Sequence, residues 1–210
     1  MSAHRHRDGS ATTKAVPTES EFRPPSSLAT VPTPTEGDLV LRRPAAEDAD
    51  TLVAGSRDPL VREFMQAVFP YQDRASAERW ITELAPRIWE SDRSAHFALA
   101  RPDGPAIGFA ELVDFRPEEA AAEASIWLLP RERRMRTATA GLRLVCRFGF
   151  EVLRLRRIDA YAAADNMPVQ VVGAAIGFRR AGFRPGLFRS SRTHRLHDAV
   201  YATLVPADLC

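Results

Sequence analysis

The sequence is poor in lysine, in cysteine and in long apolar stretches, and each shortage excludes a class of protein. Only Lys14 is a lysine among 29 basic residues, so the other 28 are arginines, and 27 acidic residues leave a formal net charge of +2. Two cysteines cannot form the framework of a disulfide-rich domain, and neither has the spacing of a zinc site. No apolar run approaches the roughly 18 to 20 residues of a membrane-spanning helix, and no apolar segment follows the first residues as in a secretory signal. We therefore expect a cytoplasmic protein without a membrane segment.

The chain divides into a tail and one domain. Residues 1–37 are rich in Ser, Thr and Pro and contain few large apolar side chains, which predicts a disordered tail. Residues 38–210 have the mixture of apolar and polar residues that is typical of a globular domain. We expect no metal cofactor, because His194 and His197 form at most an isolated pair without further ligands nearby.

Strand and helix patterns alternate after residue 38. Apolar alternation and flanking turn residues predict strands at 39–44, 96–100, 106–112, 122–129, 157–162, from 178 onward, and at 198–205. Helical spacing predicts helices from 45, at 74–90 with Asp73 as its cap, at 137–153, and at 168–176 with Gly177 as its stop. The order βααβββαβαββ predicts a mixed α+β single domain.

Three segments of this pattern occur together in a known family. They are the strand 122–128 ending before Pro130, an arginine-rich turn into the helix at 137, and the strand 157–161 followed by Asp165-Asn166 and Gly177-Phe178. Together they resemble the Gcn5-related N-acetyltransferase (GNAT) superfamily, in particular its branch that acetylates ribosomal-protein N-termini in bacteria. The resemblance covers about residues 39–205. It implies a mixed central sheet in which the parallel strands 122–129 and 157–162 splay apart.

The resemblance also implies a binding site for acetyl-CoA, the acyl donor. In this family the backbone beside the splayed strands pairs with pantetheine, which here points to Trp127, Leu128 and Leu129. A backbone N–H near Leu128 is the candidate partner of the thioester carbonyl. The following helix N-terminus binds the pyrophosphate, and Asn166 matches a further cofactor contact. The residues of the pyrophosphate turn are Arg133, Arg134, Met135, Arg136, Thr137 and Ala138.

Two positions depart from the family pattern. Arg136 stands where the family has a central glycine, which permits close backbone approach to phosphate. The arginines from 131 to 136 crowd a positive helix end and favour a bound anion. The other interpretation is a solvated basic turn that has lost the nucleotide. Val169 replaces an expected serine and cannot give a proton to the leaving thiolate.

Acetyl transfer by direct attack needs a base for the amine. Glu123 is our first candidate, because family members often use an acidic residue on this strand and its face is shared with Ser125, which can hold a water. Glu111, on the preceding strand, is the alternative. The alternative for either carboxylate is a purely structural role in a salt bridge to an arginine. Tyr161 and Tyr201 are possible proton donors, and packing is their structural interpretation.

The leading hypothesis is an acetyl-CoA-dependent N-acetyltransferase that transfers an acetyl or other acyl group to a primary amine, either a peptide or protein α-amine or a small molecule. Arg136 and Val169 motivate the alternative of a catalytically silent binding module. Nucleic-acid association through the arginines is disfavoured by the low net charge, and a homodimer is compatible with the interpretation. Aromatic residues of segments 58–73 and 183–197 predict an apolar acceptor pocket, whereas the only carboxylates noted there for a polycation are Asp58, Glu63 and Asp73. The aromatic residues are Phe64, Phe69, Tyr71 and Phe188.

Overall fold

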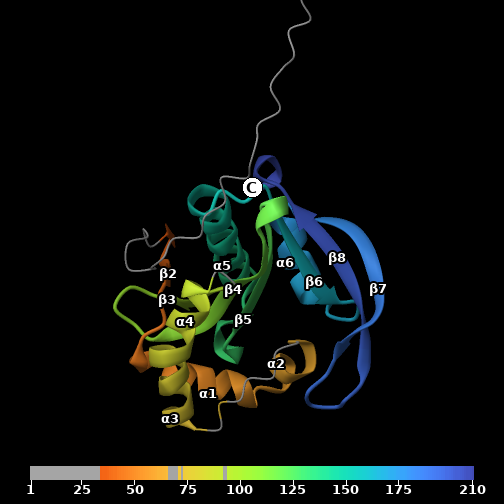
Figure 1. The fold of residues 1–210 in the computed structure, drawn as a ribbon. Coiled ribbons are helices and arrows are strands. Elements are labelled where there is room, and N and C mark those ends of the chain that lie inside the picture. The colour runs from red at the N-terminus through yellow and green to blue at the C-terminus, as the bar shows by residue number, and fades with distance from the viewer. Residues whose placement is uncertain (1–33, 66–70, 72, 92–93) are drawn as a thin grey trace, which may run out of the picture.

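A single eight-stranded sheet organises the computed structural model, which describes residues 34–65, 71, 73–91 and 94–210. The strand order is β1-β2-β3-β4-β5-β6-β8-β7. Only β5 and β6 run parallel, and the other neighbouring pairs are antiparallel. Figure 1 shows that β5 and β6 lie in the middle of the fold, with α5 and α6 beside them. The predicted α+β class is therefore confirmed.

The observed elements follow the predicted order. The strands are β1 Thr35–Glu36, β2 Leu39–Arg42, β3 Ala95–Ala100, β4 Ala106–Arg116, β5 Ala121–Leu128, β6 Arg157–Ala163, β7 Arg179–Arg189 and β8 Leu196–Leu204. The helices are α1 Ala49–Arg57, α2 Pro59–Phe64, α3 Arg74–Arg79, α4 Ala85–Glu90, α5 Met135–Arg147 and α6 Met167–Ala175. Turns of π-helix at Trp80–Leu84 and Phe148–Val152 join α3 to α4 and extend α5, so each predicted long helix is continuous.

Two short elements were not expected. The strand β1 lies within the segment that the sequence analysis placed in the tail, whose residues 1–33 lie outside the described part of the chain. The helix α2 lies in a segment read as a loop, although Asp58 followed by Pro59 is a helix-start signal. The Asp58 carboxylate accepts hydrogen bonds from the backbone of Leu60 and Val61 at 3.0 and 2.9 Å. A helix of six residues leaves too little periodicity for sequence patterning to reveal.

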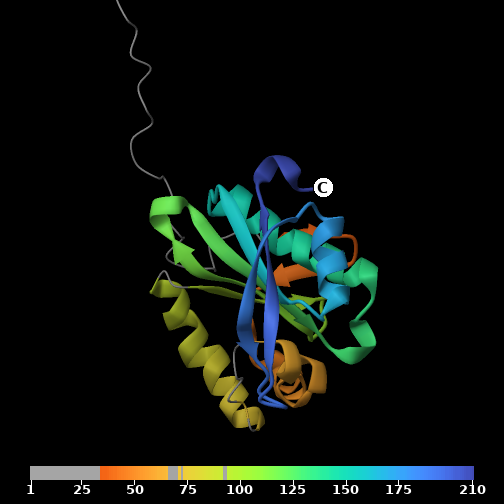
Figure 2. The same ribbon diagram turned by 90° about the vertical axis from the view of Figure 1, so that its right-hand side faces the viewer.

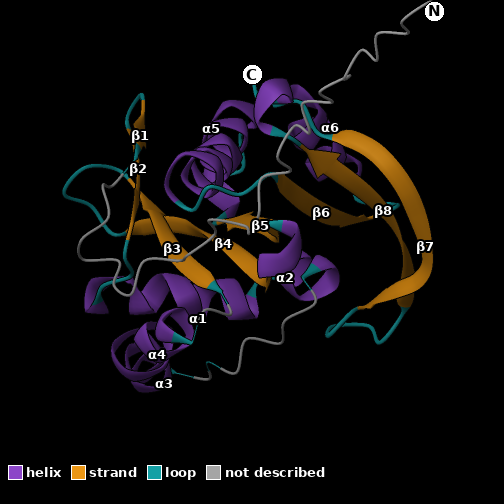
Figure 3. Ribbon diagram, turned by 45° about the horizontal axis from the view of Figure 1, so that its top comes forward, coloured by secondary structure: helices purple, strands orange, loops and turns teal. Residues whose placement is uncertain are grey.

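Alternation along β5 divides the core between the two faces of the sheet. Ala124 and Leu128 face the larger core, where Leu144 and Phe148 of the long helix are buried. Trp127 faces the second core with residues of α1 and α3. Gly55 allows this close packing, because a Cβ there would lie 2.3 Å from the Trp127 ring. Figure 3 shows α5 on one side of the sheet and α1, α3 and α4 on the other.

The end of the chain completes the sheet and approaches α2. The β7–β8 hairpin extends from the top of the molecule down to α1 and α2, as Figure 2 shows. There the Ser191 backbone N–H donates to the Arg62 carbonyl at 2.9 Å. Segments 129 residues apart in sequence are thereby held together. None of the described helices has the length and apolarity needed to span a membrane.

Candidate active site

The parallel strands β5 and β6 pair over only a short stretch and then separate. Their register covers Ala121 to Glu123 opposite Arg157 to Asp159. Beyond this fork, a cavity of about 380 Å³ lies between the strands. Its lining includes Phe64, Met65, Ala124, Ser125, Ile126, Tyr161, Ala163, Asn166, Val169, Gln170 and Val200. The expected splayed pair is confirmed, and we call the space beyond Glu123 and Asp159 the crevice.

The backbone at the end of β5 is partly used by the neighbouring strand. The Leu129 N–H donates to the Ile107 carbonyl at 2.8 Å, so Leu129 is turned toward β4. Backbone direction alternates along a strand, which turns Trp127 the same way and Leu128 toward the crevice. The Leu128 carbonyl accepts a hydrogen bond from Arg133 Nε at 3.0 Å. Of the three residues predicted to pair with pantetheine, Leu128 is therefore the one whose backbone N–H points toward the crevice.

Arg133 is held by protein groups. Besides its bond to Leu128, its guanidinium donates to Asp58 Oδ1 at 2.6 Å. Burial would raise the pKa of Asp58, but the hydrogen bond from Arg133 and those from the backbone of Val61 and Leu60 lower it below its usual value. The first residue of the predicted pyrophosphate turn thus ties α2 to the end of β5.

The rest of that turn leaves cationic groups available. Arg131 lies 3.6 Å from Glu132, whereas Arg134 and Arg136 are exposed and have no ion pair within the described ranges. The helix α5 begins at Met135, and the first N–H groups of a helix have no partner inside it. Unpaired guanidinium groups beside free N–H donors suit a phosphate anion. Thr137 and Ala138, the last residues of the turn, are partly buried in the first turn of the helix.

Asn166 lies where β6 ends and α6 begins. Its side chain lines the cavity, and its backbone N–H donates to the Ala163 carbonyl at 2.9 Å. Gln170, which sequence reasoning missed, donates from Nε2 to the carbonyls of Ala163 and Ala164 at 3.1 Å each. Gln170 thereby connects the start of α6 to the end of β6. Val169 also lines the cavity and offers no donor there.

Glu123 occupies the fork itself. It is the last paired residue of β5, opposite Asp159, and is partly buried. Burial, followed by repulsion from Asp114, Glu111 and Asp159, raises its pKa to about 7 despite the opposing charge of Arg116. Among the described residues no hydrogen bond or ion pair holds its carboxylate. Such a group suits general-base chemistry near neutral pH.

Glu111 is held differently from Glu123. Its carboxylate lies 2.8 Å from His96 Nδ1 and accepts a hydrogen bond from Ser125 Oγ at 2.6 Å. Burial would raise its pKa, but the hydrogen bonds and charge supplied by His96 and Ser125 lower it. Glu111 is therefore the weaker base of the two, and its partners are His96 and Ser125 in place of the arginine that the salt-bridge interpretation expected.

The two tyrosines beside the fork have separate environments. The Tyr201 hydroxyl donates to Asp159 Oδ1 at 3.0 Å, and Asp159 also accepts from Arg157 Nε at 2.9 Å and from Arg116. Tyr161 stacks on the Tyr201 ring, with centroids 4.9 Å apart, and lines the cavity. Tyr161 is thus the tyrosine available to a bound substrate.

The predicted acceptor residues are partly assembled here. Phe64 lines the cavity, Phe188 lies in a small core beside it with Ala163 and Ala199, and Tyr71 is buried in the second core. Phe69 lies outside the described residues. In the described part of the chain, no group of three or more histidine, cysteine or carboxylate side chains is arranged to hold a metal ion.

Comparisons with known proteins agree with this arrangement. A family model described as acetyltransferase (GNAT) domain matches residues 38–179. No curated protein sequence matches the chain significantly.

Solved structures share the fold at low sequence identity. A spermidine N-acetyltransferase from Vibrio cholerae in complex with CoA and spermine is 18% identical, with a TM-score of 0.71 over 82% of this chain and 98% of that one. RimJ of Mycobacterium smegmatis in complex with CoA-disulfide is 19% identical, with a TM-score of 0.69 over 81% and 83%. RimL, a ribosomal L7/L12 alpha-N-protein acetyltransferase in complex with coenzyme A, is 12% identical, with a TM-score of 0.72 over 82% and 97%.

Proposed function

Because this chain belongs to the GNAT acetyltransferase family, we propose that it transfers an acetyl group from acetyl-CoA to a primary amine by direct attack on the thioester. The observation that carries this proposal is the crevice between β5 and β6, with an unpaired carboxylate, Glu123, at its fork. The crevice opens toward a helix N-terminus that bears Arg134 and Arg136. The end of the crevice at the helix N-terminus therefore suits phosphate binding, and the end at the fork suits proton transfer.

The two ends of the crevice serve different parts of the donor. Leu128 lies five residues along β5 from Glu123, which is about 16 Å at the usual rise of a strand. We therefore propose that the Leu128 N–H pairs with the pantetheine near its phosphate end, rather than with the thioester. Alternation from Leu128 turns the backbone of Ala124 and Ile126 toward the crevice as well, and their N–H groups are the proposed partners of the thioester carbonyl.

Each proton in the transfer has a proposed carrier. Glu123 takes a proton from the ammonium form of the acceptor, directly or through a water held by Ser125. The freed amine forms the N–C bond, the C–S bond breaks, and the thiolate takes a proton from a donor, which regains it from the second proton that the nitrogen loses on becoming the amide. Tyr161 at the cavity wall is the proposed donor of that proton, which Val169 cannot supply.

The acceptor site suits an amine with one positive charge. The three carboxylates noted in the sequence for a polycation are all used by the protein: Asp58 binds Arg133, Glu63 binds His197 and Arg192, and Asp73 caps α3. The cavity wall next to α2 consists of Phe64 and Met65. We therefore propose a peptide or protein α-amine, or a small monoamine, in preference to a polyamine.

Calorimetry with acetyl-CoA, followed by mass spectrometry of amines incubated with acetyl-CoA, tests the proposal. We expect one acetyl-CoA per chain and acetylation of peptides with a free α-amine, with spermidine a poorer substrate. Acetylation of no amine would support the silent binding module instead, and no binding of any acyl-CoA would refute the proposed acetyl transfer. The cytoplasmic location, the homodimer and the lack of a nucleic-acid partner stay predictions from the sequence.

A further inference from the structure

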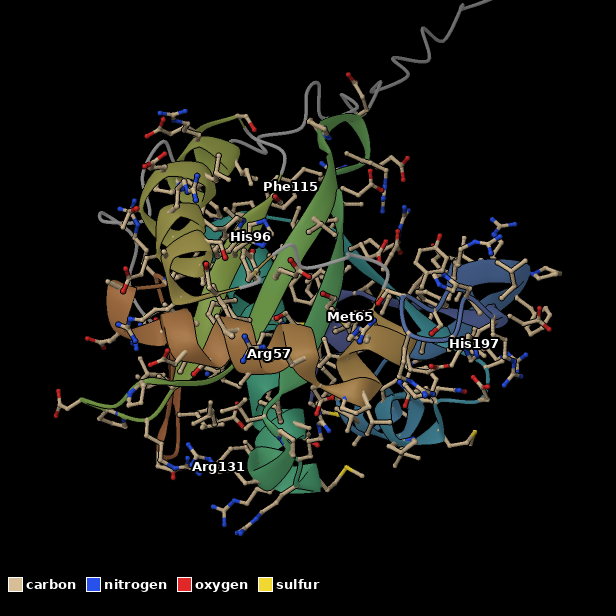
Figure 4. All side chains as sticks on the ribbon, turned by 90° about the horizontal axis from the view of Figure 1, so that it is seen from below. Arg57, Met65, His96, Phe115, Arg131 and His197 are labelled. Atoms are coloured by element: carbon tan, nitrogen blue, oxygen red, sulfur yellow. The ribbon has the colours of Figure 1, made fainter. Side chains whose placement is uncertain are left out.

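The short helix α2 is attached at its two ends to the two separated strands. At its start, Asp58 binds Arg133, which also binds the Leu128 carbonyl at the end of β5. At its end, Glu63 meets His197, which also meets Asp165 just after β6. The helix therefore spans the open side of the crevice. Figure 4 shows Met65 at the end of α2, with His197 beyond it on the hairpin side.

His197 is enclosed between two carboxylates. Only 2% of its side chain is exposed, its Nε2 lies 2.9 Å from Glu63 Oε1, and its Nδ1 lies 3.0 Å from both oxygens of Asp165. Each ring nitrogen therefore faces a carboxylate oxygen at hydrogen-bond distance, so the imidazole bridges Glu63 and Asp165.

Further groups from the β7–β8 hairpin face the same cluster. Glu63 accepts hydrogen bonds from Ser190 at 2.9 Å and Thr193 at 3.2 Å, and Arg192 lies 2.8 Å from it. Burial would raise the pKa of Glu63, but the hydrogen bonds from Ser190, His197 and Thr193 and the charge of Arg192 lower it. The cluster therefore fixes the end of α2 against the hairpin.

Both carboxylates that bind His197 are followed in sequence by residues of the cavity wall. Phe64 and Met65 follow Glu63, and Asn166 follows Asp165. The Phe64 ring also meets the imidazole edge to face, with centroids 5.6 Å apart. The imidazole thus sets the separation between the apolar wall and the wall formed at the start of α6.

We propose that His197 is a positioning residue for the acceptor amine, holding the Phe64–Met65 wall at the separation from Asn166 that brings the amine to the thioester. This inference rests on the proposed acetyl transfer and adds a residue that touches neither substrate. We expect loss of the connection to leave the donor half of the crevice in place, because Arg133 holds the Leu128 carbonyl at the opposite end of α2 from Glu63.

Steady-state kinetics of His197→Asn with acetyl-CoA and a peptide amine tests the proposal. His194→Asn is the matched control, because His194 is exposed and has a positive φ of 61° that asparagine tolerates. We expect the amine KM of His197→Asn to rise about tenfold, with kcat lowered less than threefold and the acetyl-CoA KM changed less than twofold. An amine KM equal to that of the control would overturn the proposal. Equal impairment of the amine KM, the acetyl-CoA KM and kcat would also overturn it.

Two additions keep the test decisive. Asp165→Asn changes a side chain that is 43% exposed, so it keeps the connection testable if His197→Asn does not fold, and we expect an amine KM raised about threefold. Hydrogen exchange of the α2 amides measures the connection without any activity. We expect at least tenfold faster exchange in His197→Asn than in His194→Asn, and equal exchange would refute the role of His197. An unmodified chain that acetylates no amine, while its α2 amides respond as expected, would refute the proposed function alone.

Discussion

Glu123 and Asp159 are the last residues that face each other across the parallel strands β5 and β6, and only the Asp159 carboxylate has hydrogen-bond partners among the described residues. Asp159 accepts hydrogen bonds from Tyr201, Arg157 and Arg116. Glu123 has no such bond within the described residues and carries a pKa raised to about 7. The fork thus combines a fixed anion with a carboxylate that changes charge near neutral pH.

Glu123→Gln should make the protein more stable at alkaline pH. A raised pKa means that the folded state binds the proton more tightly than the unfolded state, so stability is lost as pH rises from 4.5 to about 7. That shift corresponds to about 3 kcal/mol. Urea unfolding at pH 5 and pH 8 should show the variant gaining most of this free energy relative to the unmodified chain at pH 8. Glu151→Gln, at an exposed position, should show no gain, and an equal lack of effect in both variants would contradict the burial of an uncompensated charge.

Arg136→Ala should weaken acetyl-CoA binding about tenfold, because one unpaired cation at the start of α5 is lost, and a contact to an ionised group is worth about 1.5 kcal/mol or more. Calorimetry at two salt concentrations measures the effect, and the difference should shrink as salt rises. Arg184→Ala, which removes an exposed arginine of β7, is the control. Unchanged binding in Arg136→Ala would show that this side chain does not contact the phosphate, and tighter binding would show that it obstructs the phosphate site.

Asp58→Ala and Asp73→Ala should destabilise the protein by different amounts. Both remove a helix cap, which costs about 1 kcal/mol. Asp58 is buried and also binds Arg133, so its loss should cost about 3 kcal/mol in total. Equal losses in urea unfolding would show that the Asp58–Arg133 pair contributes nothing beyond the cap.

Tyr161→Phe should lower kcat about 100-fold, because the thiolate would leave without its proton donor. Tyr201→Phe offers the contrast, since it removes the hydrogen bond to Asp159 and should lower stability by about 1 kcal/mol while changing kcat only a few fold. Rates measured by CoA release separate the two. Similar kcat values for Tyr161→Phe and the unmodified chain would assign Tyr161 to packing.

Local patterns predicted most of the architecture. Alternation located the strands, and the cap at Asp73 and the stop at Gly177 located helix ends, because these signals depend on neighbours in sequence. The helix α2 is too short to show periodicity. Gly177 is confirmed with a positive φ of 104°, and a Cβ there would lie 1.9 Å from the Asp208 carbonyl oxygen.

The candidate site was less accessible to sequence reasoning. Glu123 was selected through the family resemblance, but its raised pKa depends on burial first and then on the charges of Asp114, Glu111 and Asp159, which only the fold brings close to it. The sequence pattern predicted a phosphate contact for Arg133. Its actual partner, Asp58, lies 75 residues away, so no local pattern could indicate the pair. The contact between Glu63 and His197 spans 134 residues, and no local pattern reveals it.

The central claim is acetyl transfer that depends on the Glu123 carboxylate, and the pH dependence of kcat/KM tests it most directly. The rate of CoA release from acetyl-CoA, with a peptide that carries a free α-amine, should be measured from pH 5.5 to pH 9 for the unmodified chain and for Glu123→Gln. Because the base must lose its proton, the account predicts a rise through about pH 7 in the unmodified chain and a rate at least 100-fold lower, without that inflection, in Glu123→Gln. Equal rates and profiles in the two proteins would contradict the account.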